Sequence, residues 1–179
     1  MELRTDIHAV LAERMPAFAK DVLVPFSEYD LRPQTLERRP MQNQIVDLSR
    51  VIGTMHPDYS GYTWLELLGG GNATSTPQLK RIDKAMSNAQ SNPDYYSSAL
   101  TKDEWYFYLV DGRYYIGENG NHRTVLARFL LACNGMPTTV SGVHVTELIL
   151  LKAESEPLAE STSLGWGARL RNFFAQQAG

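Results

Sequence analysis

The segment Asp111–Cys133, DGRYYIGENGNHRTVLARFLLAC, places glycines, a histidine and an arginine in a spacing that suits phosphate binding. Gly117 and Gly120 allow unusual backbone angles and close approach of a ligand, and His122 and Arg123 follow them. Where such a loop enters a helix, backbone N–H groups, the positive end of the helix dipole and a guanidinium point toward one place. The predicted phosphate site comprises Gly117, Gly120, Asn121, His122, Arg123 and Thr124.

A predicted β-hairpin leads into this loop. Residues 105–110 alternate in character, and every second residue from Trp105 onward forms an apolar face, which is typical of a strand. Asp111-Gly112 indicates a two-residue turn, because glycine tolerates the positive φ that a type I′ turn requires. Residues 113–116 are the predicted return strand, so the phosphate loop begins where this strand ends.

An amphipathic helix is predicted after the loop, from His122 to Cys133. Its apolar residues recur at helical spacing, Asn121 is the candidate N-cap, and Gly135 is a natural stop. Cys133 is the single cysteine of the chain and falls on the apolar face, where burial disfavours a thiolate. We therefore do not expect a cysteine nucleophile.

The order strand, Asp-Gly turn, strand, G-x-x-G-x-H-R and helix resembles the phosphate-binding core of the ParB/sulfiredoxin superfamily, with Gly120-Asn121-His122-Arg123 at its corner. Sulfiredoxins carry a cysteine where this chain has Asn121, so reduction of a sulfinic acid is not expected. A second stretch is similar to the opening segment of the family. It consists of a short strand over Val22–Pro25, a polar segment, and a helix over Met41–Gly53 with apolar residues at helical spacing.

The resemblance implies an α+β protein with the ParB/sulfiredoxin-like fold, in which a small mixed sheet is flanked by helices. We expect a single domain over residues 1–179 with an insertion at about 55–100. Further helices and one strand are predicted over 5–20, 77–89, 164–177 and 140–151. Pro16 is expected to kink or shorten the first helix. Lys80, Arg81 and Lys84 are interpreted as a solvated helix face.

The function that the resemblance implies is hydrolysis at a phosphate site. The substrate would be a nucleoside triphosphate such as ATP, or DNA cleaved with Mg²⁺. Loop amides and Arg123 would hold the developing charge, while Glu118 or His122 would position water or protonate the leaving group. Glu118 is the candidate Mg²⁺ ligand.

A second hypothesis is a non-catalytic switch that binds a nucleotide or DNA and docks a protein partner. Compact single-domain members of the superfamily are fertility-inhibition (Osa-type) proteins of conjugative plasmids, so the resemblance implies inhibition of DNA transfer and a partner in the transfer apparatus. A third hypothesis is that the protein is a docking scaffold without phosphate chemistry.

Each candidate residue also has a purely structural interpretation. Arg123 fits an ordinary surface arginine, His122 fits a capping or core-edge histidine, and Glu118 fits a brace for the loop. Asn121 fits a helix cap, a role compatible with ligand contact. The following aromatic residues are interpreted as core and sheet surface, with base stacking as the alternative: Tyr95, Tyr96, Trp105, Tyr106 and Tyr108.

Composition limits the function classes. The net charge of −3 and the isoelectric point near 5.8 argue against a dedicated duplex-DNA binder, so any contact with nucleic acid is expected to be local. A single cysteine excludes an internal disulfide framework and suits a reducing compartment. The chain has no apolar run long enough for membrane insertion and no signal-peptide pattern at MELRTDIHAV, so we expect a cytoplasmic location.

Overall fold

The computed structural model describes residues 6–26, 36–69 and 79–151. The helix predicted over 164–177 and the start of the one predicted over 77–89 lie outside the described residues. At the centre is one six-stranded sheet with the order β1-β3-β5-β4-β6-β2. Its strands are β1 (Val24–Pro25), β2 (Leu36–Asp47), β3 (Val51–Thr54), β4 (Tyr106–Val110), β5 (Arg113–Ile116) and β6 (Thr139–Leu150).

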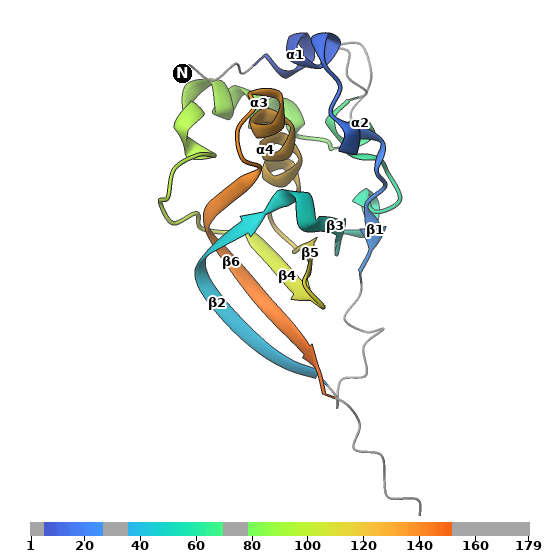
Figure 1. Cartoon of the computed structure of the whole chain (residues 1–179), viewed down its shortest axis with the longest axis vertical. Helices are drawn as coiled ribbons and strands as arrows, with labels where there is room; N and C mark the ends of the chain where they lie inside the picture. The colour runs from blue at the N-terminus through green and yellow to red at the C-terminus, as the bar shows by residue number, and fades with distance from the viewer. Residues whose placement is uncertain (1–5, 27–35, 70–78, 152–179) are drawn as a thin grey trace, which may run out of the picture.

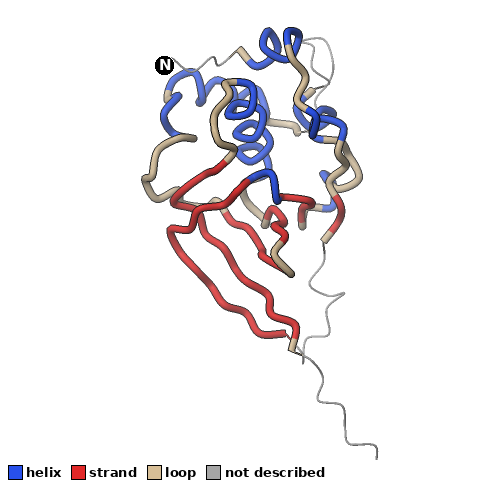
Figure 2. Tube along the Cα trace, viewed as in Figure 1, coloured by secondary structure: helices blue, strands red, loops and turns tan. Residues whose placement is uncertain are grey.

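The sheet is mixed. β1 and β3, β3 and β5, and β4 and β6 run parallel, whereas β4 and β5, and β2 and β6, are antiparallel. The expected α+β class with a mixed sheet and flanking helices is therefore confirmed at that level. Figure 1 and Figure 2 show the helices gathered at one end of the molecule, while β2 and β6 extend away from them as a long ribbon.

Four α-helices are described: α1 (Ile7–Glu13), α2 (Trp64–Leu68), α3 (Ile82–Ser91) and α4 (Asn121–Cys133). Short 3₁₀ turns occur at Ala17–Lys20, Leu48–Arg50, Pro57–Tyr59 and Pro93–Tyr95. None of the described helices is long and apolar enough to cross a membrane. The residues predicted to form an insertion, about 55–100, contain α2 and α3.

The hairpin that leads into the phosphate loop is confirmed. β4 pairs with β5, and the turn residues Asp111 and Gly112 have φ values of 47° and 74°, both in the left-handed region that a type I′ turn needs. α4 and β6 also lie within one residue of their predicted bounds, and Gly135 follows α4 with a φ of 66°. Cys133 is partly buried against the core.

The helix predicted over Met41–Gly53 is wrong. These residues form the second half of β2, a 3₁₀ turn and most of β3. The apolar spacing misled the prediction, because Ile45 is 66% exposed. β2 instead pairs with β6 along nearly its whole length, a partner about one hundred residues away in sequence, and this ladder satisfies the backbone hydrogen-bonding groups that a helix would have satisfied internally.

The helix predicted over residues 5–20 is shorter than expected. Asp6 caps α1 by accepting a hydrogen bond of 3.1 Å from the N–H of Ala9, and the helix ends at Glu13. Pro16 precedes a separate 3₁₀ turn, so the expected shortening is confirmed. Met15 lies outside the helix and is 43% exposed.

α4 is the central helix of the core and packs against α1, α2 and α3. The guanidinium of its buried Arg128 lies 4.2 Å from the ring centres of both Phe18 and Trp64 and donates a hydrogen bond of 3.3 Å to the carbonyl of Val51. Burial lowers the pKa of Arg128 to about 10, so it remains charged at neutral pH. Two aromatic faces thus hold a buried cation in the core.

Gly142→Ala is expected to destabilise the protein strongly. A Cβ at Gly142 would lie 2.1 Å from the carbonyl oxygen of Leu100, and the φ of +75° is unfavourable for alanine. We expect a loss of about 2–5 kcal/mol in the free energy of unfolding, measured with denaturant. Gly135→Ala is the matched control, because its φ is +66° with nothing within 4 Å of the new Cβ. A loss at Gly142 no larger than the roughly 1–2 kcal/mol expected at Gly135 would contradict this packing.

Candidate functional site

The phosphate loop ends at Gly120, which is the N-cap of α4 and has a φ of 120°. A side chain at this position would collide with Trp105, because a Cβ would lie 2.5 Å from the indole Cδ1. The loop therefore needs glycine here both for its conformation and for its contact with the indole.

The prediction that Asn121 caps α4 is wrong. Asn121 is the first residue of the helix, only 4% exposed, and its Oδ1 accepts a hydrogen bond of 2.8 Å from the hydroxyl of Thr54 at the end of β3. Gly120 provides no side chain to cap the helix. N–H groups in the first turn of a helix have no acceptor within that helix, and such a turn favours anions.

Two further residues of the predicted phosphate site have structural roles. The hydroxyl of Thr124 is fully buried and accepts a hydrogen bond of 2.8 Å from the indole Nε1 of Trp105. Gly117 donates its N–H to the carbonyl of Tyr106 at 2.9 Å and packs against that residue. Neither residue lines the cleft beside α4.

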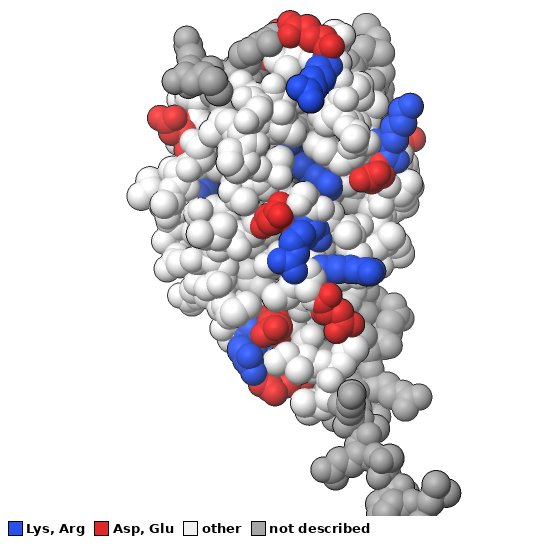
Figure 3. All heavy atoms as spheres, in the orientation of Figure 1, with Lys and Arg blue, Asp and Glu red and all other residues white. Residues whose placement is uncertain are grey.

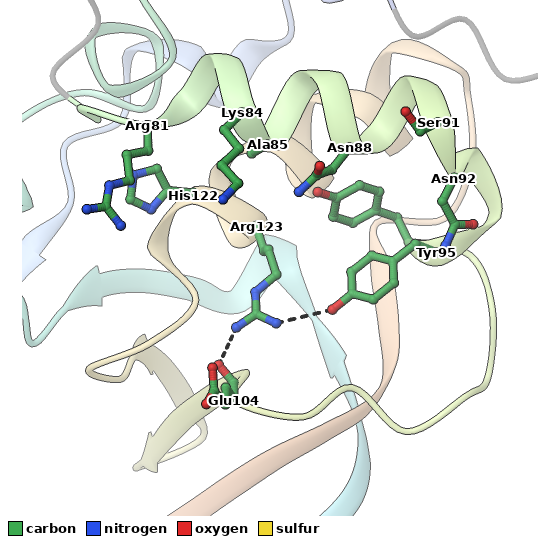
Figure 4. A pocket seen from close by; sticks show the side chains of 11 residues that line it. Arg81, Lys84, Ala85, Asn88, Ser91, Asn92, Tyr95, Glu104, His122 and Arg123 are labelled. Carbon is green, nitrogen blue, oxygen red and sulfur yellow. Dashed lines mark hydrogen bonds between the residues drawn. The ribbon is translucent and has the colours of Figure 1, made fainter.

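A cleft of about 730 Å³ lies between α3 and the first turn of α4 (Figure 4). Of the six residues in the predicted phosphate site, His122 and Arg123 line it. The full lining is Arg81, Lys84, Ala85, Asn88, Ser91, Asn92, Tyr95, Tyr96, Glu104, His122 and Arg123.

α3 contributes two cations that the sequence analysis assigned to a solvated face. Figure 4 shows Arg81 and Lys84 extending from α3 toward His122 and Arg123 of α4. Lys84 and Asn88, four residues apart, share one side of α3, and Arg81 is the N-cap residue just before the helix. That spacing was visible in the sequence, but the packing of α3 on α4, which turns this side toward the loop, was not.

Arg123 is held in place by neutral acceptors. Its Nη1 donates to the hydroxyl of Tyr95 at 3.2 Å and to the carbonyl of Asp103 at 3.0 Å, and its Nη2 donates to the carbonyl of Glu104. The guanidinium also lies 5.5 Å from the ring centre of Trp105. No ion pair to Arg123 is found among the described residues, so its positive charge is fixed at the cleft without a carboxylate partner.

His122 is the titratable group most affected by the cleft. Burial lowers its pKa below the ordinary value of 6.5, and nearby positive charges on Arg81, His56 and Arg123 lower it further. Its Nε2 is buried with no hydrogen-bond partner among the described residues, and its ring lies edge-on to Tyr59, with 6.0 Å between ring centres. His122 is therefore a neutral imidazole at pH 7.

Glu118 lies apart from this group. Its side chain is exposed and does not line the cleft, whereas Glu104 is the acidic residue of the lining. Within residues 6–26, 36–69 and 79–151, no group of three His, Cys, Asp or Glu side chains could hold a metal ion. The catalytic and Mg²⁺-binding roles of Glu118 remain predictions.

Comparisons with known proteins give no relative. No family model, curated protein or solved structure matches the chain. The resemblance to the ParB/sulfiredoxin superfamily, and the role in conjugative DNA transfer that it implies, therefore remain hypotheses that rest on the motif around Gly120–Arg123.

Arg81→Gln is expected to raise the pKa of His122, because it removes the positive charge with the largest effect on that imidazole. The pKa should stay below 6.5, since burial persists, and NMR titration of the imidazole measures it. Lys80→Gln is the matched control, because Lys80 is exposed and does not line the cleft. Equal shifts in both variants, or none in Arg81→Gln, would contradict the geometry.

The same lowered pKa predicts an effect of pH on stability. The folded protein binds the His122 proton less readily than the unfolded chain does, so the free energy of unfolding should fall as the pH decreases below 6.5. Denaturant unfolding at pH 7.5 and 5.5 measures this effect. His122→Gln should reduce the difference between the two pH values, and an unchanged difference would contradict the assignment.

Proposed function

We propose that the cleft between α3 and α4 binds the phosphate groups of a nucleotide. The observation that carries the proposal is that Arg81, Lys84 and Arg123 line one cleft beside the first turn of α4, where the N-cap Gly120 has no side chain to cap the helix. Anions favour such a turn because its N–H groups and helix dipole are both positive, and guanidinium and ammonium groups add charge-assisted hydrogen bonds.

The remaining lining suits the sugar and base of a nucleotide. Asn88, Ser91 and Asn92 supply hydrogen-bonding groups along α3, and Tyr95 supplies an aromatic ring. The volume of about 730 Å³ falls within the usual range of small-molecule sites. This distribution of side chains favours one orientation of the nucleotide, with its phosphates at the Arg81 end of the cleft and its base toward Asn92.

The resemblance at Gly120–Arg123 supports the same proposal from the sequence, because the family places a phosphate at this corner. Among the described residues, Glu118 does not belong to any group of three His, Cys, Asp or Glu side chains that could hold a metal ion, so we assign no step to a metal held by the protein. Binding, the second hypothesis of the sequence analysis, is therefore the function that the geometry supports best.

Lys84→Gln and Arg81→Gln are each expected to weaken binding of ATP about tenfold or more, because each removes a charged hydrogen-bond donor. Isothermal titration calorimetry with ATP, ADP and adenosine measures the affinities, and adenosine should bind much more weakly than ATP. Lys80→Gln should bind as the unsubstituted protein does. If the three variants bind ATP equally well, or if the protein binds adenosine as tightly as ATP, the phosphate site is wrong.

Hydrolysis is the second candidate, and a specific observation favours it. His122 lines the cleft and burial lowers its pKa, so its imidazole is neutral at pH 7, which is the protonation state that a general base requires. If the protein releases phosphate from ATP, His122→Gln should lower the rate about 100-fold or more while ATP still binds. The rate should fall at acidic pH as His122 becomes protonated. Turnover that survives the substitution would exclude this role.

A further inference from the structure

The sheet has a second face, opposite the one that packs against the helices. Side chains on the first face belong to one hydrophobic core with the helices, and the strands contribute Phe107, Tyr114, Ile116, Val143 and Val145. Because successive residues of a strand point to opposite faces, the alternate residues of β4, β5 and β6 face away from this core.

Several of those alternate residues are aromatic. Tyr106 pairs with His144, and Tyr108 pairs with Tyr115, so the four side chains stand on the same face of three adjacent strands. Phe26, just after β1, joins them by stacking on Tyr115. None of the five belongs to the hydrophobic core among the described residues.

The rings of this aromatic face form two stacked pairs. Phe26 and Tyr115 have ring centres 4.5 Å apart and planes 29° from parallel, and Tyr106 and His144 have centres 5.1 Å apart and planes 25° from parallel. Tyr106 is 40% exposed, and the other four are partly exposed. Aromatic rings are therefore accessible across β1, β5, β4 and β6.

Gly53 explains how the Tyr115 ring is placed. Gly53 in β3 pairs with Tyr115, and a Cβ at Gly53 would lie 2.8 Å from Tyr115 Cδ1. The ring thus occupies space that any other residue would fill with its side chain. This lets the ring lie along the sheet toward Phe26 instead of standing away from it.

Two arginines occupy strand positions near the aromatic residues of this face. Arg113 pairs with Val110 at one end of the aromatic face, and Arg38 pairs with Leu148 on the β2–β6 ribbon. Strand alternation places both arginines on the aromatic side, where Asp47, paired with Thr139 at the far end of β2, is the acidic strand position among the described residues. Elsewhere, as Figure 3 shows for one view, acidic and basic residues are interspersed.

We propose that this aromatic face binds single-stranded nucleic acid. Bases would stack on the rings of Tyr106, Tyr108 and Tyr115, and backbone phosphates would contact Arg113 and Arg38. Single strands fit because their bases expose flat faces that a duplex hides, and stacking with adjacent cations is how sequence-tolerant single-strand sites work. Because the net charge of the chain is −3, contact with nucleic acid is expected to be confined to a local site such as this one. This face is separate from the cleft at α3 and α4, and the proposal does not depend on nucleotide binding there.

Fluorescence anisotropy with a labelled oligodeoxythymidylate of about 12 nucleotides tests the proposal. The protein should bind this strand at least tenfold more tightly than a duplex of the same length. The protein should also bind the oligodeoxythymidylate at least tenfold more tightly than an abasic strand with the same number of phosphates. Equal affinity for the abasic strand would show that charge alone is responsible and would overturn the proposal, as would no binding of any strand.

Variants separate the aromatic face from the cleft. Tyr106→Leu and Tyr115→Leu should each weaken binding about fivefold or more, and Arg113→Gln should reduce the slope of log affinity against log salt by about 0.7. Lys80→Gln, which is outside the cleft, is the matched control and should leave oligonucleotide binding unchanged. If Lys84→Gln weakens binding and the tyrosine variants do not, the oligonucleotide binds in the cleft and the proposal is wrong. Circular dichroism checks that each variant is folded.

Discussion

The arrangement of the cleft depends on the packing of Trp105. Its indole is fully buried, donates a hydrogen bond to Thr124 of α4, contacts Gly120 where a side chain would not fit, and lies beneath the guanidinium of Arg123. Its backbone carbonyl accepts a hydrogen bond of 3.0 Å from the N–H of His144 in β6. One residue thus connects the start of β4 with β6 and with the first turn of α4.

This connection explains why a cation remains at the cleft without a carboxylate partner. Arg123 donates to the carbonyls of Asp103 and Glu104, which immediately precede Trp105, and these neutral acceptors fix the guanidinium but leave its charge. α3 then adds Arg81 and Lys84 from the other side. Burial, together with the charges of Arg81 and Arg123, lowers the pKa of His122 and favours its neutral form. The cleft therefore combines fixed cations with an uncharged imidazole, which suits an anionic ligand.

The sequence predicted the elements whose patterns are local. The Asp111-Gly112 turn, the strands on either side of it and α4 were found because turn chemistry and apolar periodicity act within a few residues. The second half of β2 was mistaken for a helix because its identity depends on β6, which is distant in the chain. His122 and Arg123 were found from the loop motif, whereas Arg81 and Lys84 were missed because only tertiary packing brings α3 to that loop. The capping role predicted for Asn121 is wrong because its hydrogen-bond partner, Thr54, belongs to β3, which is 67 residues away in the sequence.

The most direct test of the phosphate site is an NMR titration of ¹⁵N-labelled protein with ATP. If the cleft binds phosphate, the largest chemical-shift changes should occur at the backbone amides of residues 121–123, with further changes along residues 81–92 of α3. Inorganic pyrophosphate should shift the amides of 121–123 in the same direction, because these report the phosphate rather than the base. Changes confined to other parts of the protein, or none at saturating ATP, would contradict the assignment of this cleft.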